Sequence, residues 1–257
     1  LGWKMRSLAY LRGLIGRRSK GYEIMMPVKI SKPVGGNPGN SGLDTVVITH
    51  GLWMTGAELY LLRKRLRAAG FRTFQFSYQS RTENPDKNCE RLAAFLENVP
   101  GDRVHLVGHS LGGVLMLNLL ERYQPVRVGR VVCLVPPLKG SIAAQALAFS
   151  FFGNRLLGSS AAYFVREKGV APRSVYQQVG VIAGNLSLGV GRFVGDVPYP
   201  NDGTIAVKET ELQGIKDHIV LHVSHFSVLV SRAAANQVLH FLRFGSFFHE
   251  SSDSLIN

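Results

Sequence analysis

Five residues, Gly108-His109-Ser110-Leu111-Gly112, stand between a strand pattern and a helix pattern, and this junction constrains the fold more than any other feature. Residues 103–107 read as a short buried strand, and residues 113–120 read as a helix. A Gly-x-Ser-x-Gly segment at such a junction makes a sharp turn that lifts the serine hydroxyl clear of the sheet edge. Glycine fits at both flanking positions because the chain folds back closely there. The pattern predicts a nucleophilic Ser110; the alternative is a glycine-rich helix start that the serine caps.

The 257-residue chain alternates apolar strands with amphipathic helices, which is typical of an α/β fold with a mostly parallel central sheet flanked by helices. We expect strands at 45–49, 72–77, 103–107, 130–135, 178–183 and 218–223, and helices at 57–69, 86–98, 113–120 and 226–244. Residues 138–175 break this alternation with an apolar helix at 141–152, at the position of a short cap or lid over an active site. The predicted organisation is a basic segment and loop (1–42), one α/β domain (43–245) and a tail (246–257).

A serine needs a base to accept its proton and a third group to orient that base. His225 follows the strand at 218–223 and precedes the final helix, which is where the base belongs in this chain order. The competing histidines are His218, at the start of that strand, and His222, within it. We therefore predict His225 as the base.

Asp202 is the predicted acid that orients His225. It lies in Asn201-Asp202-Gly203-Thr204, after the strand that ends near residue 183. The same four residues would also make an ordinary Asp-Gly turn. Asp196 and Asp217 are the rival acids, although Asp217 stands too close to the start of the histidine strand to reach its far end.

Negative charge that develops on a substrate oxygen needs two backbone N–H donors, an oxyanion hole. We expect one donor from Leu111, directly after Ser110, and the other from Leu52 in the loop His50-Gly51-Leu52-Trp53, with Trp53 as the alternative. His50 is interpreted as a structural residue that holds this loop. The predicted substrate-binding residues are apolar and include three from the cap; the alternative is that they are plain domain core. They are Trp53, Leu147, Phe149 and Phe152.

These motifs together resemble the α/β-hydrolase superfamily, and within it the bacterial lipases and esterases. The resemblance covers about residues 43–245 with every motif in the expected order. It implies a catalytic triad of Ser110, Asp202 and His225 with the amides of Leu52 and Leu111 as the oxyanion hole. It implies no cofactor and no metal ion. The cap segment matches no known lipase lid, so the resemblance does not indicate which acyl chain length is preferred.

The expected activity is hydrolysis of carboxylic esters through an acyl-serine intermediate, on lipids or other esters with apolar acyl groups. A thioesterase, an amidase or an acyltransferase would use the same triad, and these classes stay open. A hydrolase-fold protein that binds ligands without catalysis is the alternative from a different class.

The chain carries 30 Lys and Arg against 17 Asp and Glu, and residues 1–32 hold eight of these cations with one acid, Glu23. Apolar residues recur among them at near-helical spacing, as in an amphipathic helix on an anionic membrane surface; the alternative is a helix docked on the domain. No nucleic-acid motif appears, so we predict no nucleic-acid partner. Arginines interrupt every apolar stretch of the first 20 residues, unlike a secretory signal. Two isolated cysteines favour a reducing compartment, and we predict a cytoplasmic protein, with membrane association and export left open.

Overall fold

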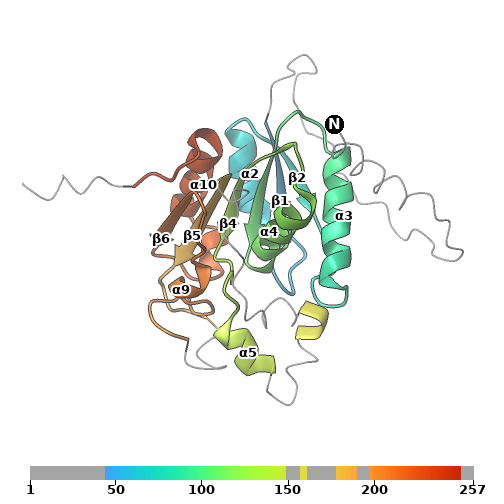
Figure 1. Cartoon of the computed structure of the whole chain (residues 1–257). Helices are drawn as coiled ribbons and strands as arrows, with labels where there is room; N and C mark the ends of the chain where they lie inside the picture. Colours follow the sequence, from blue (N-terminus) through green and yellow to red (C-terminus); the bar gives the residue numbers. More distant parts are fainter. Residues whose placement is uncertain (1–43, 149–156, 161–177, 190–196, 250–257) are drawn as a thin grey trace, which may run out of the picture. The chain divides into compact units, whose positions relative to one another are not determined.

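The computed structural model describes residues 44–148, 157–160, 178–189 and 197–249. Six strands in these ranges form one parallel sheet in the order β2-β1-β3-β4-β5-β6 (Figure 1). They are β1 (Thr45–Thr49), β2 (Arg72–Phe76), β3 (Val104–His109), β4 (Val128–Leu134), β5 (Val179–Gly184) and β6 (Asp217–Leu221). The predicted fold class, a parallel sheet flanked by helices, is confirmed.

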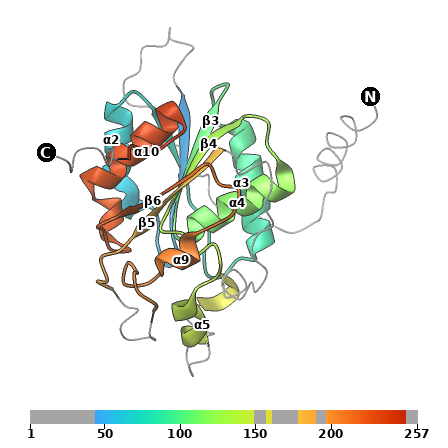
Figure 2. The same cartoon turned by 60° about the vertical axis from the view of Figure 1, so that its left-hand side comes forward.

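Helices cover both faces of the sheet. Figure 2 shows α2 (Tyr60–Ala68) and α10 (Arg232–Phe244) on one face, and α3 (Pro85–Asn98) and α4 (Leu111–Tyr123) on the other. Because alternate residues of a strand point to opposite faces, each strand feeds two cores. In β1, Val46 and Ile48 pack in the core with α2 and α10, whereas Val47 packs in the core with α3 and α4. Both cores are built of buried aliphatic and aromatic side chains, which makes the sheet a rigid support for the loops at its edge.

The strand order determines where a site can form. The chain runs from β1 outward to β2, returns to β3 on the other side of β1, and then continues to β6. Loops that follow β1 and β3 therefore leave the sheet in opposite directions and open a crevice at the carboxyl ends of these strands, which is the usual ligand site in open α/β sheets. Thr49, the last residue of β1, is paired with Gly108 of β3, so the two loops start side by side.

The final helix predicted over 226–244 is present and ends at Phe244, but its predicted start is wrong, because two helical pieces occupy this range. Residues Ser227–Leu229 form the 3-10 turn η4, and α10 begins only at Arg232. Ser231 separates them: its backbone is extended (φ −61°, ψ 131°) and its hydroxyl accepts a hydrogen bond from the Ala234 N–H at 3.2 Å. Serine is a favoured N-cap residue, so the break is encoded locally.

Other boundaries differ from the prediction by a few residues. The predicted helix over 57–69 opens as the 3-10 turn η1 (Ala57–Leu59), and the strand predicted over 218–223 ends at Leu221. The predicted cap helix over 141–152 begins as α5 (Ile142–Ala148), and its remaining residues lie outside the described ranges. Two further short helices are η2 (Gly158–Ser160) and α9 (Val207–Thr210). In the described ranges no helix is long and apolar enough to span a bilayer.

Candidate active site

Ser110 lies at the turn between β3 and α4, with backbone angles φ 51° and ψ −119°. A positive φ in a residue with a Cβ costs about 1–3 kcal/mol and persists only where the surroundings enforce it. The turn is tightly packed: a Cβ at Gly108 would lie 2.6 Å from the Gly113 nitrogen. A Cβ at Gly112 would lie 2.6 Å from a backbone oxygen of the loop after β1. Both glycines of the motif are therefore required by close backbone approach, and we call residues 108–112 the elbow.

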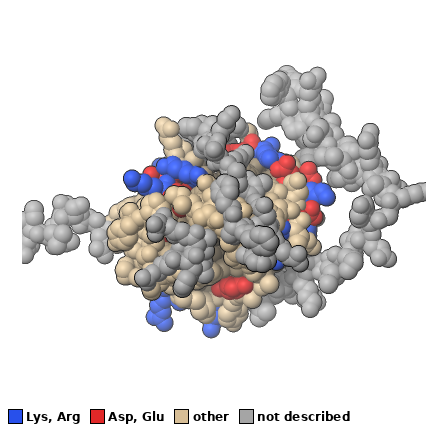
Figure 3. All heavy atoms as spheres, turned by 90° about the horizontal axis from the view of Figure 1, so that it is seen from below, with Lys and Arg blue, Asp and Glu red and all other residues tan. Residues whose placement is uncertain are grey.

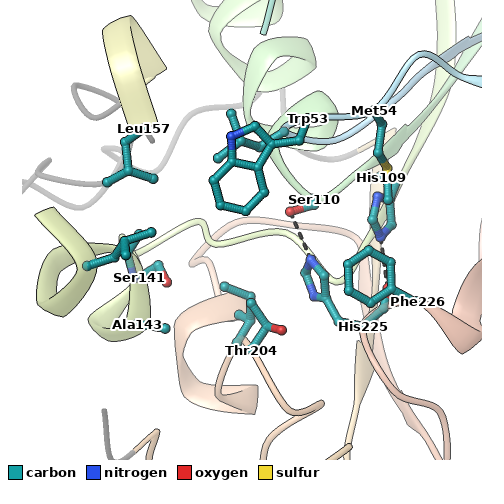
Figure 4. Close-up of a pocket in the computed structure, with 14 residues that line it drawn as sticks. Trp53, Met54, His109, Ser110, Ser141, Ala143, Leu157, Thr204, His225 and Phe226 are labelled. Atoms are coloured by element: carbon teal, nitrogen blue, oxygen red, sulfur yellow. Dashed lines mark hydrogen bonds between the residues drawn. The ribbon is translucent and has the colours of Figure 1, made fainter. Parts of the chain in front are cut away.

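Ser110, His225 and Asp202 form one hydrogen-bonded chain. His225 Nε2 lies 3.1 Å from Ser110 Oγ (Figure 4), and His225 Nδ1 lies 2.7 Å from Asp202 Oδ2. The carboxylate accepts a hydrogen bond from Nδ1–H, which leaves the lone pair of Nε2 directed at the serine hydroxyl. All three are buried, with exposed fractions of 8% for Ser110, 5% for His225 and 1% for Asp202. The structure thus brings together the three residues that the sequence indicates, from three separate loops.

The second carboxylate oxygen of Asp202 is held by its own loop. Asp202 Oδ1 accepts hydrogen bonds from the N–H groups of Thr204 at 2.8 Å and Ile205 at 2.7 Å. The backbone also joins the acid to the base, because the His225 N–H donates to the Asp202 carbonyl oxygen at 2.9 Å. Gly203 completes the turn with φ 89°, and a Cβ there would lie 2.3 Å from the backbone of Leu188. The predicted Asp-Gly turn is present, and it also orients the carboxylate.

The competing residues lie elsewhere. His218 Nε2 contacts Thr210 Oγ1 at 2.9 Å, and His222, exposed beyond the end of β6, contacts the Asn185 side chain at 3.1 Å. The Asp217 carboxylate accepts from the Phe247 N–H at 2.7 Å. Asp196 lies outside the described residues.

His50 and Tyr78 hold the loop that follows β1. His50 Nδ1 donates to the Gly51 carbonyl oxygen at 2.8 Å, and its Nε2 accepts from the Tyr78 N–H at 3.3 Å. The Tyr78 hydroxyl donates to the His50 carbonyl oxygen at 3.0 Å, and the two rings stack with centroids 4.6 Å apart. Burial lowers the pKa of His50, which keeps the ring neutral and this arrangement intact. His50 thus has the structural role that the sequence predicts.

The two N–H groups predicted to form an oxyanion hole are those of Leu52 and Leu111. Leu111 is the first residue of α4, so its N–H has no partner within the helix, and Leu52 lies in the turn closed by the Met54 N–H and the Gly51 oxygen at 3.4 Å. In the described part of the chain neither N–H has an acceptor. The alternative donor, the Trp53 N–H, is 3.3 Å from Ser80 Oγ and already bonded. The geometry therefore favours Leu52 over Trp53.

A pocket opens beside Ser110, and α5 and Leu157 form the wall opposite the triad (Figure 4). Trp53 and Leu147, two of the predicted substrate-binding residues, line it, whereas Phe149 and Phe152 lie outside the described residues. Sequence reasoning missed several residues of the wall, because they come from separate stretches of the chain that only the fold brings together. They are Met54, Ser141, Ala144, Leu157, Thr204, Ile205 and Phe226.

The pocket is chemically simple. Among its described lining residues there is no Lys, Arg, Asp or Glu. Seen from the end of the molecule that carries α5 and α9, much of the described surface is neither acidic nor basic (Figure 3). The described residues also contain no group of three or more His, Cys, Asp or Glu side chains that could hold a metal ion. The pocket suits an uncharged, largely apolar ligand.

Comparison with known proteins identifies the class. The family model described as "Alpha/beta hydrolase family" matches residues 46–234, and this chain belongs to that family. Among solved structures, the mature form of lipase BlEst2 from Bacillus licheniformis is similar at a TM-score of 0.56 and 17% identity, over 77% of this chain and 90% of that one. The propeptide form of the same lipase gives a TM-score of 0.66 and 18% identity, over 82% of this chain and 52% of that one. Carboxylesterase CesB from Bacillus subtilis is similar at a TM-score of 0.52 and 15% identity, over 80% of this chain and 86% of that one. No curated protein sequence matches the chain.

Proposed function

We propose that this protein is a serine carboxylic-ester hydrolase that acts on uncharged esters with apolar acyl groups. The observation that carries this proposal is the hydrogen-bonded chain from Asp202 through His225 to Ser110 at the wall of a pocket whose described lining residues include no Lys, Arg, Asp or Glu. Membership of the alpha/beta hydrolase family and the likeness to lipase and carboxylesterase structures support it.

In the proposed acylation step, Ser110 Oγ bonds to the ester carbonyl carbon while His225 Nε2 takes the serine proton. The carbonyl electron pair moves onto oxygen, where the N–H groups of Leu52 and Leu111 stabilise the negative charge. Loss of one such donor typically costs about 2.7–4 kcal/mol of transition-state stabilisation. As the carbonyl re-forms, the bond to the alcohol oxygen breaks, and His225 gives its proton to that oxygen.

Deacylation repeats these steps with water. His225 takes a proton from a water molecule as its oxygen bonds to the acyl carbon, and then returns the proton to Ser110 Oγ as the ester bond breaks. The products are a carboxylic acid and the free serine. No cofactor enters this scheme.

The test is hydrolysis of p-nitrophenyl esters from acetate to palmitate by the wild type and by Ser110→Ala. We expect activity in the wild type and loss of at least about a thousandfold in the variant, because no other group replaces the nucleophile. Ser159→Ala is the matched control, since the Ser159 hydroxyl bonds the Thr82 carbonyl oxygen and Ser159 is not among the described residues that line the pocket. Equal activity of Ser110→Ala and the wild type would contradict the proposal.

Other outcomes of this test would favour a different function for the same site. Activity on thioesters or amides with none on oxygen esters would favour a thioesterase or an amidase, and product transfer to an added alcohol would favour an acyltransferase. No turnover of any acyl compound would favour a binding protein.

A further inference from the structure

His109, the last residue of β3, is a buried polar residue that the mechanism above does not use. Its ring Nε2 lies 2.9 Å from the backbone oxygen of His225, and the centroids of the two imidazole rings are 5.1 Å apart. A carbonyl oxygen can only accept, so His109 Nε2 carries the proton and donates. Figure 4 shows the His109 ring beside the backbone of His225 and the pocket. This bond joins residues 116 positions apart in the sequence.

The other side of the ring faces the loop after β1. With the proton on Nε2, Nδ1 holds only a lone pair, and within the described residues this buried atom has no hydrogen-bond partner. A Cβ at Gly51 would lie 2.9 Å from Nδ1, so the ring packs directly against the backbone of that loop. Gly51 precedes Leu52, the proposed oxyanion donor. The ring of this elbow residue therefore contacts both the backbone of His225 and the loop after β1 that carries Leu52.

The ring is held in one protonation state. It has an exposed fraction of 0%, and burial, with the nearby His225 adding to it, lowers the pKa of His109 to about 3. At neutral pH the ring has no charge, so it places no positive charge next to the base. The neutral ring carries one proton, so it remains a donor at Nε2 at neutral pH.

We infer that His109 is a positioning residue. Its Nε2–H bond holds the backbone of His225 in place relative to the elbow and to the loop that carries Leu52. The inference rests on the proposed function. His109 touches no reacting atom; its effect is exerted through the placement of His225 Nε2 relative to Ser110 Oγ. Misplacement of a catalytic group by about 1 Å can cost on the order of a hundredfold in rate.

Three substitutions of His109, by Gln, Asn and Phe, distinguish the effect of the hydrogen bond from the effect of the ring volume. The side-chain nitrogen of Gln is as many bonds from Cβ as His109 Nε2, whereas that of Asn is one bond shorter. Phe fills the space without a donor. We expect His109→Phe and His109→Asn to lower kcat on p-nitrophenyl butyrate by about tenfold or more, with KM within about twofold, and His109→Gln to recover most of the rate.

A second readout does not depend on ester turnover. In protein labelled with ¹⁵N-histidine, His109 should give a slowly exchanging Nε2–H signal of the neutral ring that stays unchanged between pH 5 and pH 9. The inference is overturned if this ring shows Nδ1–H or titrates, or if Gln and Asn are equally active, or if the loss falls on KM alone. Absence of ester hydrolysis in the wild type would instead contradict the proposed function, and the NMR signal would still decide the role of His109.

Discussion

Glu209 Oε1 accepts a hydrogen bond from the backbone N–H of Ile142 at 2.6 Å, which ties α9 to the first residue of α5. The other carboxylate oxygen accepts from the Ala206 N–H at 2.7 Å. Ala206 belongs to the loop that carries Asp202, whereas α5 supplies the far wall of the pocket. A single buried carboxylate therefore fixes the cap helix relative to the acid of the triad.

The pH dependence of stability tests this link. Burial raises the pKa of Glu209, the N–H groups of Ile142 and Ala206 oppose the shift, and the charge of Asp202 adds to it. A carboxyl group with a raised pKa binds its proton more tightly in the folded protein. Its contribution to the free energy of unfolding is therefore largest below the ordinary pKa of 4.5 and falls as pH rises through the folded value.

Glu209→Gln removes this titration. We expect the difference in free energy of unfolding, wild type minus Glu209→Gln, to decrease as pH rises from about 4 to about 7. Urea unfolding of both proteins across this range measures it. A difference that grows with pH would contradict a raised pKa of Glu209 in the folded protein.

Thr204→Val should stabilise the protein. Thr204 Oγ1 is buried and, in the described part of the chain, has no hydrogen-bond partner, and such burial costs about 1–3 kcal/mol. We expect the variant to raise the free energy of unfolding by about 1 kcal/mol. Thr210→Val is the matched control and should lower it, because Thr210 Oγ1 bonds the Val207 oxygen at 2.7 Å. If Thr204→Val lowers the free energy of unfolding as much as Thr210→Val does, the Thr204 hydroxyl has a hydrogen-bond partner and the prediction is wrong.

Leu157→Trp should narrow the acyl side of the pocket. Leu157 is buried and lines the pocket opposite the triad. Each methylene of the acyl chain that the larger side chain keeps out of the pocket costs about 0.8 kcal/mol of binding. We therefore expect kcat/KM for p-nitrophenyl palmitate to fall at least about tenfold more than kcat/KM for p-nitrophenyl acetate. Leu61→Trp, at an exposed position on α2, is the control. Equal losses for both esters would show that this wall does not contact the acyl chain.

The basic first segment predicts attraction to anionic lipid. Six of its eight cations lie within residues 1–26. Each cation near an anionic surface contributes about 1 kcal/mol, so deletion of residues 1–26 should weaken binding to phosphatidylserine vesicles by more than about a hundredfold. Neutral vesicles are the control, and hydrolysis of a soluble ester should persist. Unchanged vesicle binding would remove the membrane surface as a partner of this segment.

The sequence predicts the fold and the triad positions because both are written in local patterns. A glycine-flanked serine between strand and helix, and a histidine between the last strand and the last helix, can each be recognised from a few neighbouring residues. Asp202 follows from chain order together with the turn that holds it. The α/β class follows from the alternation of strand and helix patterns.

The contacts that hold these residues in place are not local. His109 meets the backbone of His225, and Glu209 meets Ile142 from 67 positions away, so neither contact leaves a pattern in the sequence. The clue to both is a polar residue at a position that the fold buries. The first helical piece, η4, ends at Leu229, and Ser231 caps the start of α10; the apolar periodicity that continues through these residues conceals the break. The roles of Phe149 and Phe152 stay predictions.

Covalent labelling by a fluorophosphonate, followed by intact-mass and peptide mass spectrometry, shows directly whether Ser110 is the nucleophile. We expect one adduct per chain on the peptide that contains Ser110, no adduct in Ser110→Ala, and slow labelling in His225→Ala, since the base activates the hydroxyl. A wild type that forms no adduct, or a Ser110→Ala variant that still forms one, would contradict the assignment of Ser110 as the nucleophile.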